Sequence, residues 1–524
     1  MLKLKNLRNK NIHIVGLSGT EGAQIAKFLQ AKKCKNVTAH DFCEEKDFRE
    51  NFLMFHGALD IEDRKKYFKE INDLPIKKCF KKNYLEDIEK ADLIFVSQGW
   101  YLYPFNKPKL FNAQKSGIPF YTILNVYLSI CKAKTIGITG SNGKTTTSRL
   151  IYETLKLKSQ SSKLKALYVG NDRGAIQDLF GVEKLKKDDF LVLEISNRQL
   201  KFLKDVSPNV AVIINITENH LNEHESFEEY AETKFKIFKF QKKGDYAIIN
   251  FDDKMSRQCL DNSPHPSLKR EGVSNLVRFS VKEKTDVFIK NKKIFIAKKI
   301  PASAGMTEEE IEILDLNNIK IPGKHNVENV LAAVSATYFA GVKPEIIKKA
   351  ISNFKGVEKR LEFMDEIKGV RYYNDLSSTT PVSTIAGINA FKGAKYLTLI
   401  LGGDHKNVSY NELMKVLIDK VDMVILMPGT ILEKLKMKNL SLTMIGGEKL
   451  KIKTKFFKVQ TALEAFQIAS KKTKAGGVVL LSPAGEGFFS KFLNRRTGGL
   501  SLKKILSKIS NLKHLQSRVG RTKI

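Results

Sequence analysis

The chain has 524 residues, of which 42% are hydrophobic and 28% are charged, and its formal net charge at pH 7 is +34. This length predicts several domains, about two to four, because a single hydrophobic core stops growing well below it. The longest apolar runs, such as residues 210–216, have the length of a strand, so the sequence excludes a membrane-spanning helix.

The chain carries 90 Lys and Arg residues against 56 Asp and Glu residues, which raises nucleic-acid binding as a hypothesis. The lysines are spread along the whole chain, and no zinc-finger or RRM signature accompanies them. This pattern favours a solvated surface that attracts anionic nucleotides, without a nucleic-acid partner. The five cysteines form no CxxC pair and no signal peptide is visible, so we expect a protein of the reducing cytoplasm.

The first segment, residues 11–29, reads as a strand, a Gly-rich turn and an amphipathic helix. A second strand ends in Asp41, and an acidic residue is typical of this position in a dinucleotide-type fold. Residues 44–90 are charged and helical in character, and residues 91–100 return to a strand followed by a loop. We therefore predict a Rossmann-like α/β domain over residues 1–132.

The next segment, residues 135–150, reads TIGITGSNGKTTTSRL: a β-branched run, a Gly-rich turn and the start of a helix. In such a turn backbone N–H groups close around phosphate oxygens, Lys144 reaches the β- and γ-phosphates, and the Thr145 hydroxyl binds magnesium. The standard P-loop has a Gly where Ile138 stands, which points to a narrower family; the alternative is a plain turn with a solvated lysine. The predicted nucleotide loop consists of Gly140, Ser141, Asn142, Gly143, Lys144, Thr145 and Thr146.

Strands and helices alternate over residues 133–355, which predicts a central, P-loop ATPase-like domain with a mostly parallel sheet. Residues 286–299 predict a hairpin whose turn lies at Asn291 and Lys292. The neighbouring residues 262–272 and 301–310 have the composition of loops, and we expect both to be insertions.

A third α/β domain, again Rossmann-like, is predicted over residues 356–524, with strands at YLTLILGG, DMVILMPG and GVVLLSPAG. The chain ends in a basic amphipathic helix. Its apolar face favours docking on its own domain over contact with a membrane surface or a partner.

Two polar residues follow apolar strands of the central segment, at the sheet edge where α/β proteins bind ligands. Glu194 ends the strand in LVLEISNRQL, and His220 lies just beyond another in INITENHLNEH. Taken singly, each is more often a capping or solvated residue. Together with the Thr145 hydroxyl they would supply the sparse ligands that magnesium between phosphates accepts.

At this point the sequence resembles the Mur ligase family, the ATP-dependent amide-bond-forming enzymes of peptidoglycan precursor synthesis. The matching motifs occur in family order and are GITGSNGKTTT, LEISNRQL, NITENHLNEH, YAETK, GKHNVENVLAA, KRLEF, NDLSSTTP, LGGDHK and LLSPAG. The N-terminal GLSGTEGA, HDF and FVSQGW look most like the members that add D-glutamate to UDP-N-acetylmuramoyl-L-alanine. The resemblance implies ATP and Mg²⁺ as cofactors, an acyl phosphate intermediate, and release of ADP and phosphate; we expect a monomer.

The resemblance also implies roles for single residues. The catalytic residues are Lys144, Glu194, His220 and Lys234. Lys234 of YAETK matches a lysine that carries a carbamate in the family. The metal is held by Thr145, Glu194, His220 and Lys234. The nucleotide is contacted beyond the loop by Asn326, Asn329, Arg360 and Asp375. The UDP part of the substrate is bound by Thr20, Asp41, Ser97 and Gly99, the muramoyl part by Asn171 and Ser196, and the incoming amino acid by Thr379 and Lys406.

Four positions depart from the family pattern. Gln98 stands in place of a Pro in the SPG loop, and Asn219 stands in place of an Asp before the His. Ser377 and Gly487 stand where a Lys and a Ser of the amino-acid pocket are usual. Two alternatives therefore stay open: another Mur-type or folate-type polyglutamate ligase with a different acceptor, and a P-loop ATPase that is not a ligase.

Overall fold

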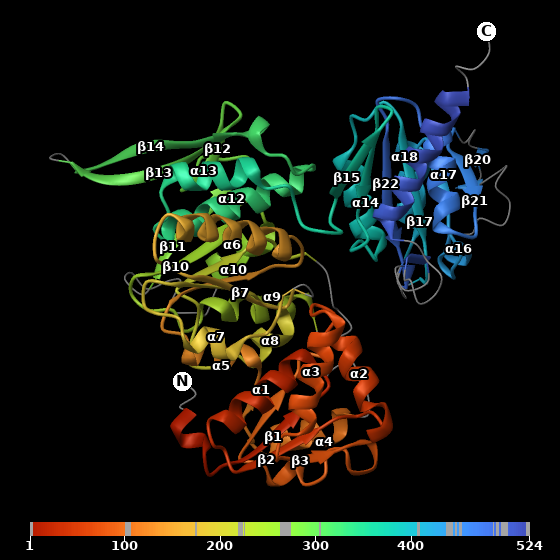
Figure 1. Cartoon of the computed structure of the whole chain (residues 1–524). Coiled ribbons are helices and arrows are strands. Elements are labelled where there is room, and N and C mark those ends of the chain that lie inside the picture. The colour runs from red at the N-terminus through yellow and green to blue at the C-terminus, as the bar shows by residue number, and fades with distance from the viewer. Residues whose placement is uncertain are drawn as a thin grey trace. The chain divides into compact units, whose positions relative to one another are not determined.

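The computed structural model of the protein divides by its internal contacts into two compact units (Figure 1). The first unit contains residues 1–318 and 327–353, and the second contains residues 319–326 and 354–524. The structure describes residues 4–99, 106–172, 175–217, 224, 226–262, 274–302, 305–405, 409–435, 444–445, 448–449, 453–485, 487–488, 492–493 and 501–519.

The first unit begins with a five-stranded parallel sheet in the order β3-β2-β1-β4-β5. In this order the winding reverses between β1 and β4, so the loops that follow these two strands meet at the site typical of ligands in doubly wound folds. A strand, β3, lies in the segment that we predicted to be helical. The strands are β1 (Asn11–Val15), β2 (Asn36–His40), β3 (Lys77–Cys79), β4 (Leu93–Val96) and β5 (Phe120–Tyr121). The helices are α1 (Thr20–Ala31), α2 (Phe48–Phe55), α3 (Ile61–Asn72), α4 (Lys107–Lys115) and α5 (Ile123–Ile130).

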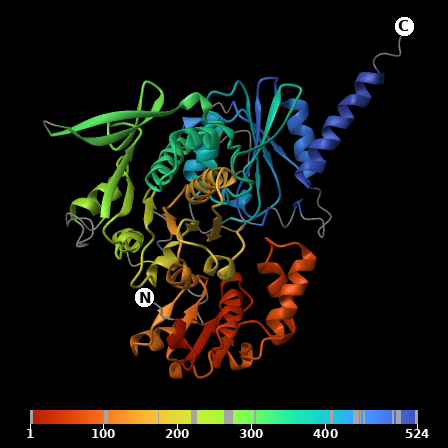
Figure 2. The same cartoon turned by 60° about the vertical axis from the view of Figure 1, so that its left-hand side comes forward.

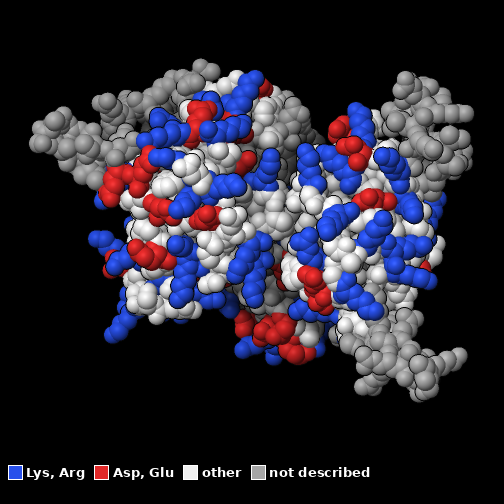
Figure 3. Space-filling view, turned by 90° about the horizontal axis from the view of Figure 1, so that it is seen from above, with Lys and Arg blue, Asp and Glu red and all other residues white. Residues whose placement is uncertain are grey.

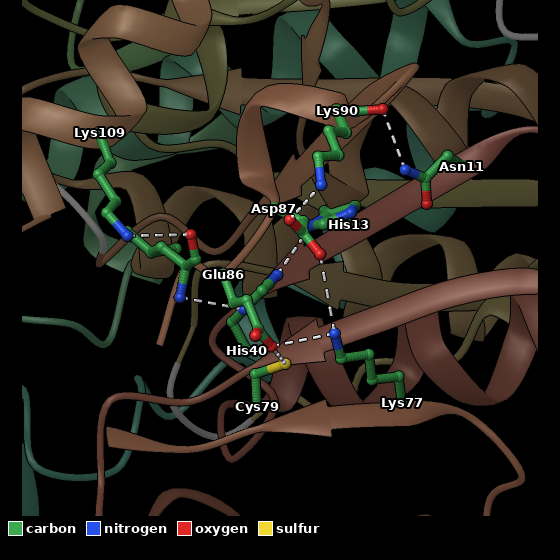
Figure 4. Close-up of polar contacts among 10 residues, drawn as sticks. Asn11, His13, His40, Lys77, Cys79, Glu86, Asp87, Lys90 and Lys109 are labelled. Carbon is green, nitrogen blue, oxygen red and sulfur yellow. Dashed lines mark hydrogen bonds and ion pairs between the residues drawn. The ribbon is translucent and has the colours of Figure 1, made fainter. Parts of the chain in front are cut away.

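Two buried histidines join β1 to β2. The Nδ1 atom of His13 lies 2.8 Å from the Nε2 atom of His40, and the backbone N–H of Leu85 donates to Nδ1 of His40 over 3.2 Å (Figure 4). Because Nδ1 of His40 accepts, the proton of this ring is on Nε2, which donates to His13. Burial lowers the pKa of His13 to about 4 and that of His40 to about 3, so both rings are neutral at pH 7.

The same unit contains a nine-stranded sheet in the order β14-β13-β12-β11-β10-β9-β6-β8-β7. The pairs from β7 to β12 are parallel, and β13 and β14 are antiparallel additions at one edge. The strands are β6 (Lys134–Thr139), β7 (Ala166–Gly170), β8 (Phe190–Glu194), β9 (Val210–Ile213), β10 (Asp245–Asn250), β11 (Ser274–Ser280), β12 (Val287–Lys290), β13 (Lys293–Ala302) and β14 (Gly305–Asp315). The helices are α6 (Lys144–Gln160), α7 (Leu179–Glu183), α8 (Asn197–Lys201), α9 (Phe227–Phe235), α10 (Lys254–Asn262), α12 (Lys324–Phe339) and α13 (Pro344–Asn353).

The edge hairpin confirms one prediction and corrects another. Asn291 and Lys292 form its turn, with positive φ angles of 51° and 59°. The prediction that residues 301–310 form a loop is wrong, because residues 301–302 end β13 and residues 305–310 begin β14. These two strands project as a ribbon in Figure 2. Ion pairs offset the loop-like composition: Lys290 of β12 lies 2.7 Å from Glu310 of β14, across the intervening β13. Most of the other predicted insertion, residues 262–272, lies outside the described residues.

The second unit is built on a six-stranded sheet in the order β15-β16-β22-β17-β18-β21, in which only the β15–β16 pair is antiparallel. Three of its strands are those predicted from the sequence. The three large sheets and their helices confirm the predicted α/β fold class. The strands are β15 (Glu362–Ile367), β16 (Val370–Asn374), β17 (Leu397–Gly402), β18 (Met423–Leu426), β21 (Lys455–Lys458) and β22 (Val478–Ala484), and the pair β19 (Met444–Ile445) and β20 (Glu448–Lys449) stands apart. The helices are α14 (Pro381–Ala390), α15 (Asn411–Lys420), α16 (Ile431–Lys434), α17 (Ala462–Lys472) and α18 (Leu502–Val519).

The basic C-terminal helix α18 docks on its own unit, as the sequence predicted. Leu502, Ile505, Leu506 and Ile509 are buried in the core that also contains Phe466 of α17. No helix among the described residues, α18 included, combines the length and the apolar character that a bilayer crossing requires.

The basic side chains do not gather in one block on the face shown in Figure 3. Lysines and arginines are spread there over the described surface, with fewer acidic residues between them. This distribution agrees with the predicted solvated, lysine-rich surface.

Candidate active site

The predicted nucleotide loop connects β6 to α6, and its geometry depends on a glycine. Gly143 has a φ of +83°, and a Cβ atom there would lie 2.1 Å from Oδ1 of Asn329, so no other residue fits without displacement. Asn215, which follows β9, fixes the other side of the loop. Its backbone oxygen accepts from the Ser141 N–H over 2.9 Å, and its side-chain oxygen accepts from the Asn142 N–H over 2.9 Å.

Two lysines converge on one carbonyl group of this loop. The Nζ atom of Lys144, the first residue of α6, donates to the oxygen of Gly140 over 2.8 Å and to that of Ser141 over 3.0 Å. The Nζ atom of Lys234 on α9 donates to the same Gly140 oxygen over 3.0 Å. The helix N-terminus adds a positive dipole end at this place, so the structure gathers positive charge where phosphate groups are expected.

Lys234 is 1% exposed, which is unusual for a lysine. Burial first, and the charge of Lys144 second, lower the pKa of its amine well below the usual value. Its Nζ atom lies 4.6 Å from the ring centre of Tyr230, whose hydroxyl is 3.0 Å from Oγ of Ser141. The environment therefore favours the neutral amine, which is nucleophilic.

Glu194 ends β8 and is 3% exposed. In the sheet it is the partner of Ile138 on β6, so its carboxylate belongs to the same edge as the nucleotide loop. Tyr168 donates from its hydroxyl to Oε2 of Glu194 over 3.3 Å, and Asn171 donates from its amide to Oε1 over 3.3 Å. Asn171 is therefore held beside Glu194.

The predicted metal ligands are only partly covered by the structure. Thr145 is buried in the first turn of α6, whereas His220 lies outside the described residues. Within the described ranges no group of three or more His, Cys, Asp or Glu side chains is arranged for a metal ion. Sparse oxygen ligands from the protein suit Mg²⁺, which is usually bound by one or two carboxylates, substrate phosphates and water.

The predicted UDP residues lie in, or at the end of, the loops that follow β1, β2 and β4. Asp41 accepts from the backbone N–H of Ser18 over 2.6 Å, which holds the Gly-rich turn before α1. A Cβ atom on Gly16, whose φ is +98°, would lie 2.5 Å from Oγ of Ser97, so the two loops are in close contact. Thr20 begins α1, and Gly99 has open space where a Cβ atom would lie.

Arg360, Asp375 and Thr379 lie in the second unit. Asp375 is 4% exposed; it accepts from the hydroxyl of Ser482 over 2.9 Å and from the backbone N–H of Leu361 over 3.2 Å. Burial raises its pKa to about 6, although these hydrogen bonds and the charge of Arg360 oppose the shift. Thr379 lies in the turn that follows Asp375, just before α14.

Two predicted asparagines lie at and near the start of α12. The Asn326 amide donates to the backbone oxygen of Pro322 over 2.6 Å. Asn329 on α12 lies in the other unit, where its Oδ1 atom accepts from the hydroxyl of Thr147 over 3.4 Å. Lys406 lies outside the described residues.

The sequence did not single out Asn215, Tyr168 or Tyr230, which hold the loop and its acidic and basic side chains. Asn215 could have been found, because it is a polar residue directly after a buried parallel strand, at the edge where ligands bind. The tyrosines gave no such signal, since an aromatic residue on a strand or helix is usually part of the core.

A parallel sheet with a phosphate-type loop and convergent lysines defines this chain as a nucleotide-dependent enzyme. Residues 138–337 match the Mur ligase middle domain. UDP-N-acetylmuramoylalanine–D-glutamate ligase from Clostridium botulinum is 31% identical over 485 residues, which are 92% of this chain and 93% of that protein. The ligase of the same name from Acetivibrio thermocellus is 31% identical over 510 residues, 96% of this chain and 98% of that protein. The chain therefore belongs to the Mur ligase family, as its motifs predicted, and it is an ATP-dependent ligase.

Solved structures agree at the level of the fold. UDP-N-acetylmuramate-alanine ligase from Thermotoga maritima superposes with a TM-score of 0.52 at 18% identity, covering 94% of this chain and 98% of that chain. A pseudomurein peptide ligase type C from Methanothermus fervidus gives a TM-score of 0.50 at 20% identity, with coverages of 96% and 100%.

Proposed function

We propose that this protein adds D-glutamate to UDP-N-acetylmuramoyl-L-alanine with ATP, releasing ADP and phosphate, as a cytoplasmic monomer. The names of the relatives that match over nearly the whole chain support the substrates. The observation that carries the proposal is the convergence of Lys144 and Lys234 on the Gly140 oxygen at the N-terminus of α6.

In this proposal the substrate carboxylate attacks the γ-phosphate of ATP, and the amine of the incoming amino acid then attacks the acyl phosphate. The N–H groups of the loop and the Lys144 ammonium stabilise the charge on the transferring phosphoryl group. Lys144 is preorganised for this task because two backbone oxygens already direct its amine toward the loop. The remaining loop residues, Gly140 to Thr146, enclose the phosphates.

Lys234 is proposed to carry a carbamate. Its buried amine is held in the neutral form, and only a neutral amine adds CO₂, which gives a carbamate and releases one proton. With Glu194, Thr145 and His220, the new carboxylate would hold Mg²⁺, because oxygen and sparse nitrogen ligands suit this ion. Magnesium, when bound, neutralises phosphate charge.

The other predicted residues divide by substrate. Thr20, Asp41, Ser97 and Gly99 are proposed to bind UDP at the point where the first sheet reverses its winding. Asn171 and Ser196, at the edge of the central sheet, are proposed to bind the muramoyl group. For ATP we propose Asn326, Asn329, Arg360 and Asp375, and for the amino acid Thr379 and Lys406.

Two residues in the second unit favour a different acceptor amino acid as a second candidate. Ser377 stands in place of a lysine and is exposed, and Gly487 stands in place of a serine, with a φ of +71° that favours glycine. A pocket with fewer cationic and hydroxyl groups binds a side-chain carboxylate less tightly. We favour D-glutamate because one retained lysine, Lys406, can supply most of the charge stabilisation.

The test offers the purified protein ATP, magnesium and UDP-N-acetylmuramoyl-L-alanine with D-glutamate, L-glutamate, D-aspartate, L-lysine or glycine in turn. We expect phosphate release and a product of the ligated mass with D-glutamate. Strong release with another amino acid and none with D-glutamate would identify the second acceptor. Phosphate release that does not depend on the UDP substrate would identify an ATPase and reject the ligase.

A further inference from the structure

A buried carboxylate connects the first sheet of this unit to the central one. Glu21, in the first turn of α1, is 3% exposed. Its Oε2 atom accepts from the backbone N–H of Gln98 over 3.0 Å, and its Oε1 atom accepts from the Gln199 amide of α8 over 2.8 Å. One side chain therefore fixes both the loop after β4 and the turn after β8.

The second connection is the side chain of Gln98 itself. Its Oε1 atom accepts from the hydroxyl of Ser196 over 2.8 Å. Ser196 also caps α8: its hydroxyl accepts from the Gln199 N–H over 3.2 Å, and its own N–H donates to Oε1 of Gln199 over 3.1 Å. Glu21, Gln98, Ser196 and Gln199 thus form a closed circuit of hydrogen bonds across two sheets.

This circuit depends on a departure from the family pattern. A proline at position 98 has no N–H to donate to Glu21 and no side-chain oxygen to accept from Ser196. The bond to Glu21 therefore needs a residue other than proline at position 98, and the bond from Ser196 needs the glutamine side chain. The mechanism described above uses neither Glu21 nor Gln98.

The two ends of the circuit lie in the two halves of the proposed substrate site. Gln98 lies between Ser97 and Gly99, the proposed UDP residues, whereas Ser196 lies two residues after Glu194. We propose that Glu21 and Gln98 are positioning residues that set the spacing between the UDP loop and the muramoyl site. This inference rests on the proposed function, since it takes a UDP-linked sugar acid as the substrate that spans both halves.

Only the ionised form of Glu21 completes the circuit. Both of its partners are N–H donors, so a protonated carboxyl group, or a Gln amide in its place, leaves two donors facing one another. Burial raises the pKa of Glu21 to about 7, against the opposing effect of its hydrogen bonds to Gln98 and Gln199. The ionisable side chain from a packed helix that interacts with it is Tyr127 of α5, whose pKa is itself raised well above the usual value by burial.

The experiment compares the full-length wild type with Glu21→Gln and Gln98→Ala. For Glu21→Gln we expect the KM for the UDP substrate and the Kd for UDP alone to rise roughly 10-fold at pH 8.5, as for one lost hydrogen bond to a charged group. For Gln98→Ala, which loses the bond between two neutral groups, the rise should be roughly 5-fold. The KM for ATP and kcat should change less than about 3-fold. The exposed Glu45→Gln and Gln114→Ala serve as matched controls and should behave as the wild type.

The pH dependence gives a second readout that a merely structural role would not change. The ratio of the KM of Glu21→Gln to that of the wild type should fall toward one as the pH falls below about 7. Unchanged UDP affinity in both variants would overturn the inference. An equal rise in the KM for the UDP substrate and the KM for ATP, together with a lowered Tm, would overturn it as well. If the wild type binds UDP but does not use D-glutamate, the proposed function fails, while the UDP affinities still decide the inference.

Discussion

The first unit contains two pairs of basic side chains, and they differ in what surrounds them. His13 and His40 hydrogen-bond to one another and to the Leu85 N–H, in a chain whose tautomers are fixed. Lys144 and Lys234, in contrast, direct two amines at a single carbonyl oxygen. The histidine pair satisfies its own hydrogen bonds and stabilises the fold, whereas the lysine pair places one ammonium and one buried neutral amine at a single acceptor, an arrangement that suits a phosphate site.

This difference explains why a lowered pKa by itself is a weak sign of function. The histidines have it because they are buried in a sheet. Lys234 has it because it is buried and also faces Lys144. The comparison predicts that removal of the lysines affects turnover first, and removal of a histidine affects stability first.

The largest effect is expected for Lys144→Ala. The charge that it supplies is needed where phosphoryl charge develops, so kcat should fall by at least about 10³-fold while the Tm stays near that of the wild type. The exposed Lys156→Ala, on the same helix, is the matched control. A folded Lys144→Ala variant with near-normal phosphate release would contradict the nucleotide loop.

Lys234→Met should lower kcat by about 10²-fold or more, because it removes the proposed carbamate near the transferring phosphate. It should leave the Tm equal or higher, since the buried amine loses hydration on folding and a methionine does not. Carbon-13 NMR with labelled bicarbonate should show a carbamate signal in the wild type and none in the variant. An active wild type without this signal, insensitive to removal of bicarbonate, rejects the carbamate.

Asp375 tests whether a buried acid in the second unit acts in nucleotide binding or only stabilises the fold. Asp375→Asn should raise the KM for ATP roughly 10-fold at pH 8, as expected for a lost charged hydrogen-bond acceptor. Because the folded protein raises the pKa of this group to about 6, its protonated form favours folding. The wild type should therefore gain stability relative to the variant as the pH falls through 6.

The exposed Asp365→Asn is the control for this substitution. A variant that changes only the Tm, with an unaltered KM for ATP, would place Asp375 with the structural groups and remove it from the nucleotide site.

The smallest effect is expected for the histidine pair and concerns stability. The folded protein holds the pKa of His13 near 4, below its value of about 6.5 in an unfolded chain. The unfolded state therefore binds more protons, and stability is lost as the pH falls from about 6.5 toward 4. His13→Asn keeps an acceptor for His40 without this titration. Between pH 7.5 and 5 its Tm should fall about 2 to 4 °C less than that of the wild type. Equal losses in both proteins, or a large fall in turnover at pH 7.5, would remove the contrast with the lysines.

Local patterns in the sequence predicted much of the fold. The strands beside the Gly-rich turns and the hairpin turn at Asn291 and Lys292 lie where they were expected, because turn residues and apolar periodicity act over a few neighbours. The strand ends at residues 301–302 and 305–310 were missed for the opposite reason. Their composition is that of a loop, and Lys290 of β12 reaches Glu310 of β14 only because both strands pair with β13 in this register.

The sequence by itself determined the phosphate-type loop, the Mur ligase family and the order of its motifs, since these depend on residue types at fixed spacings. Only the tertiary structure decided that Lys234 is buried against the Gly140 oxygen, and that Glu21 meets Gln199, which is 178 positions away in the chain. The physical reason is that pKa values and hydrogen-bond circuits depend on burial and distance. These are set by which strands lie side by side in the sheets, and no local run of residues specifies them.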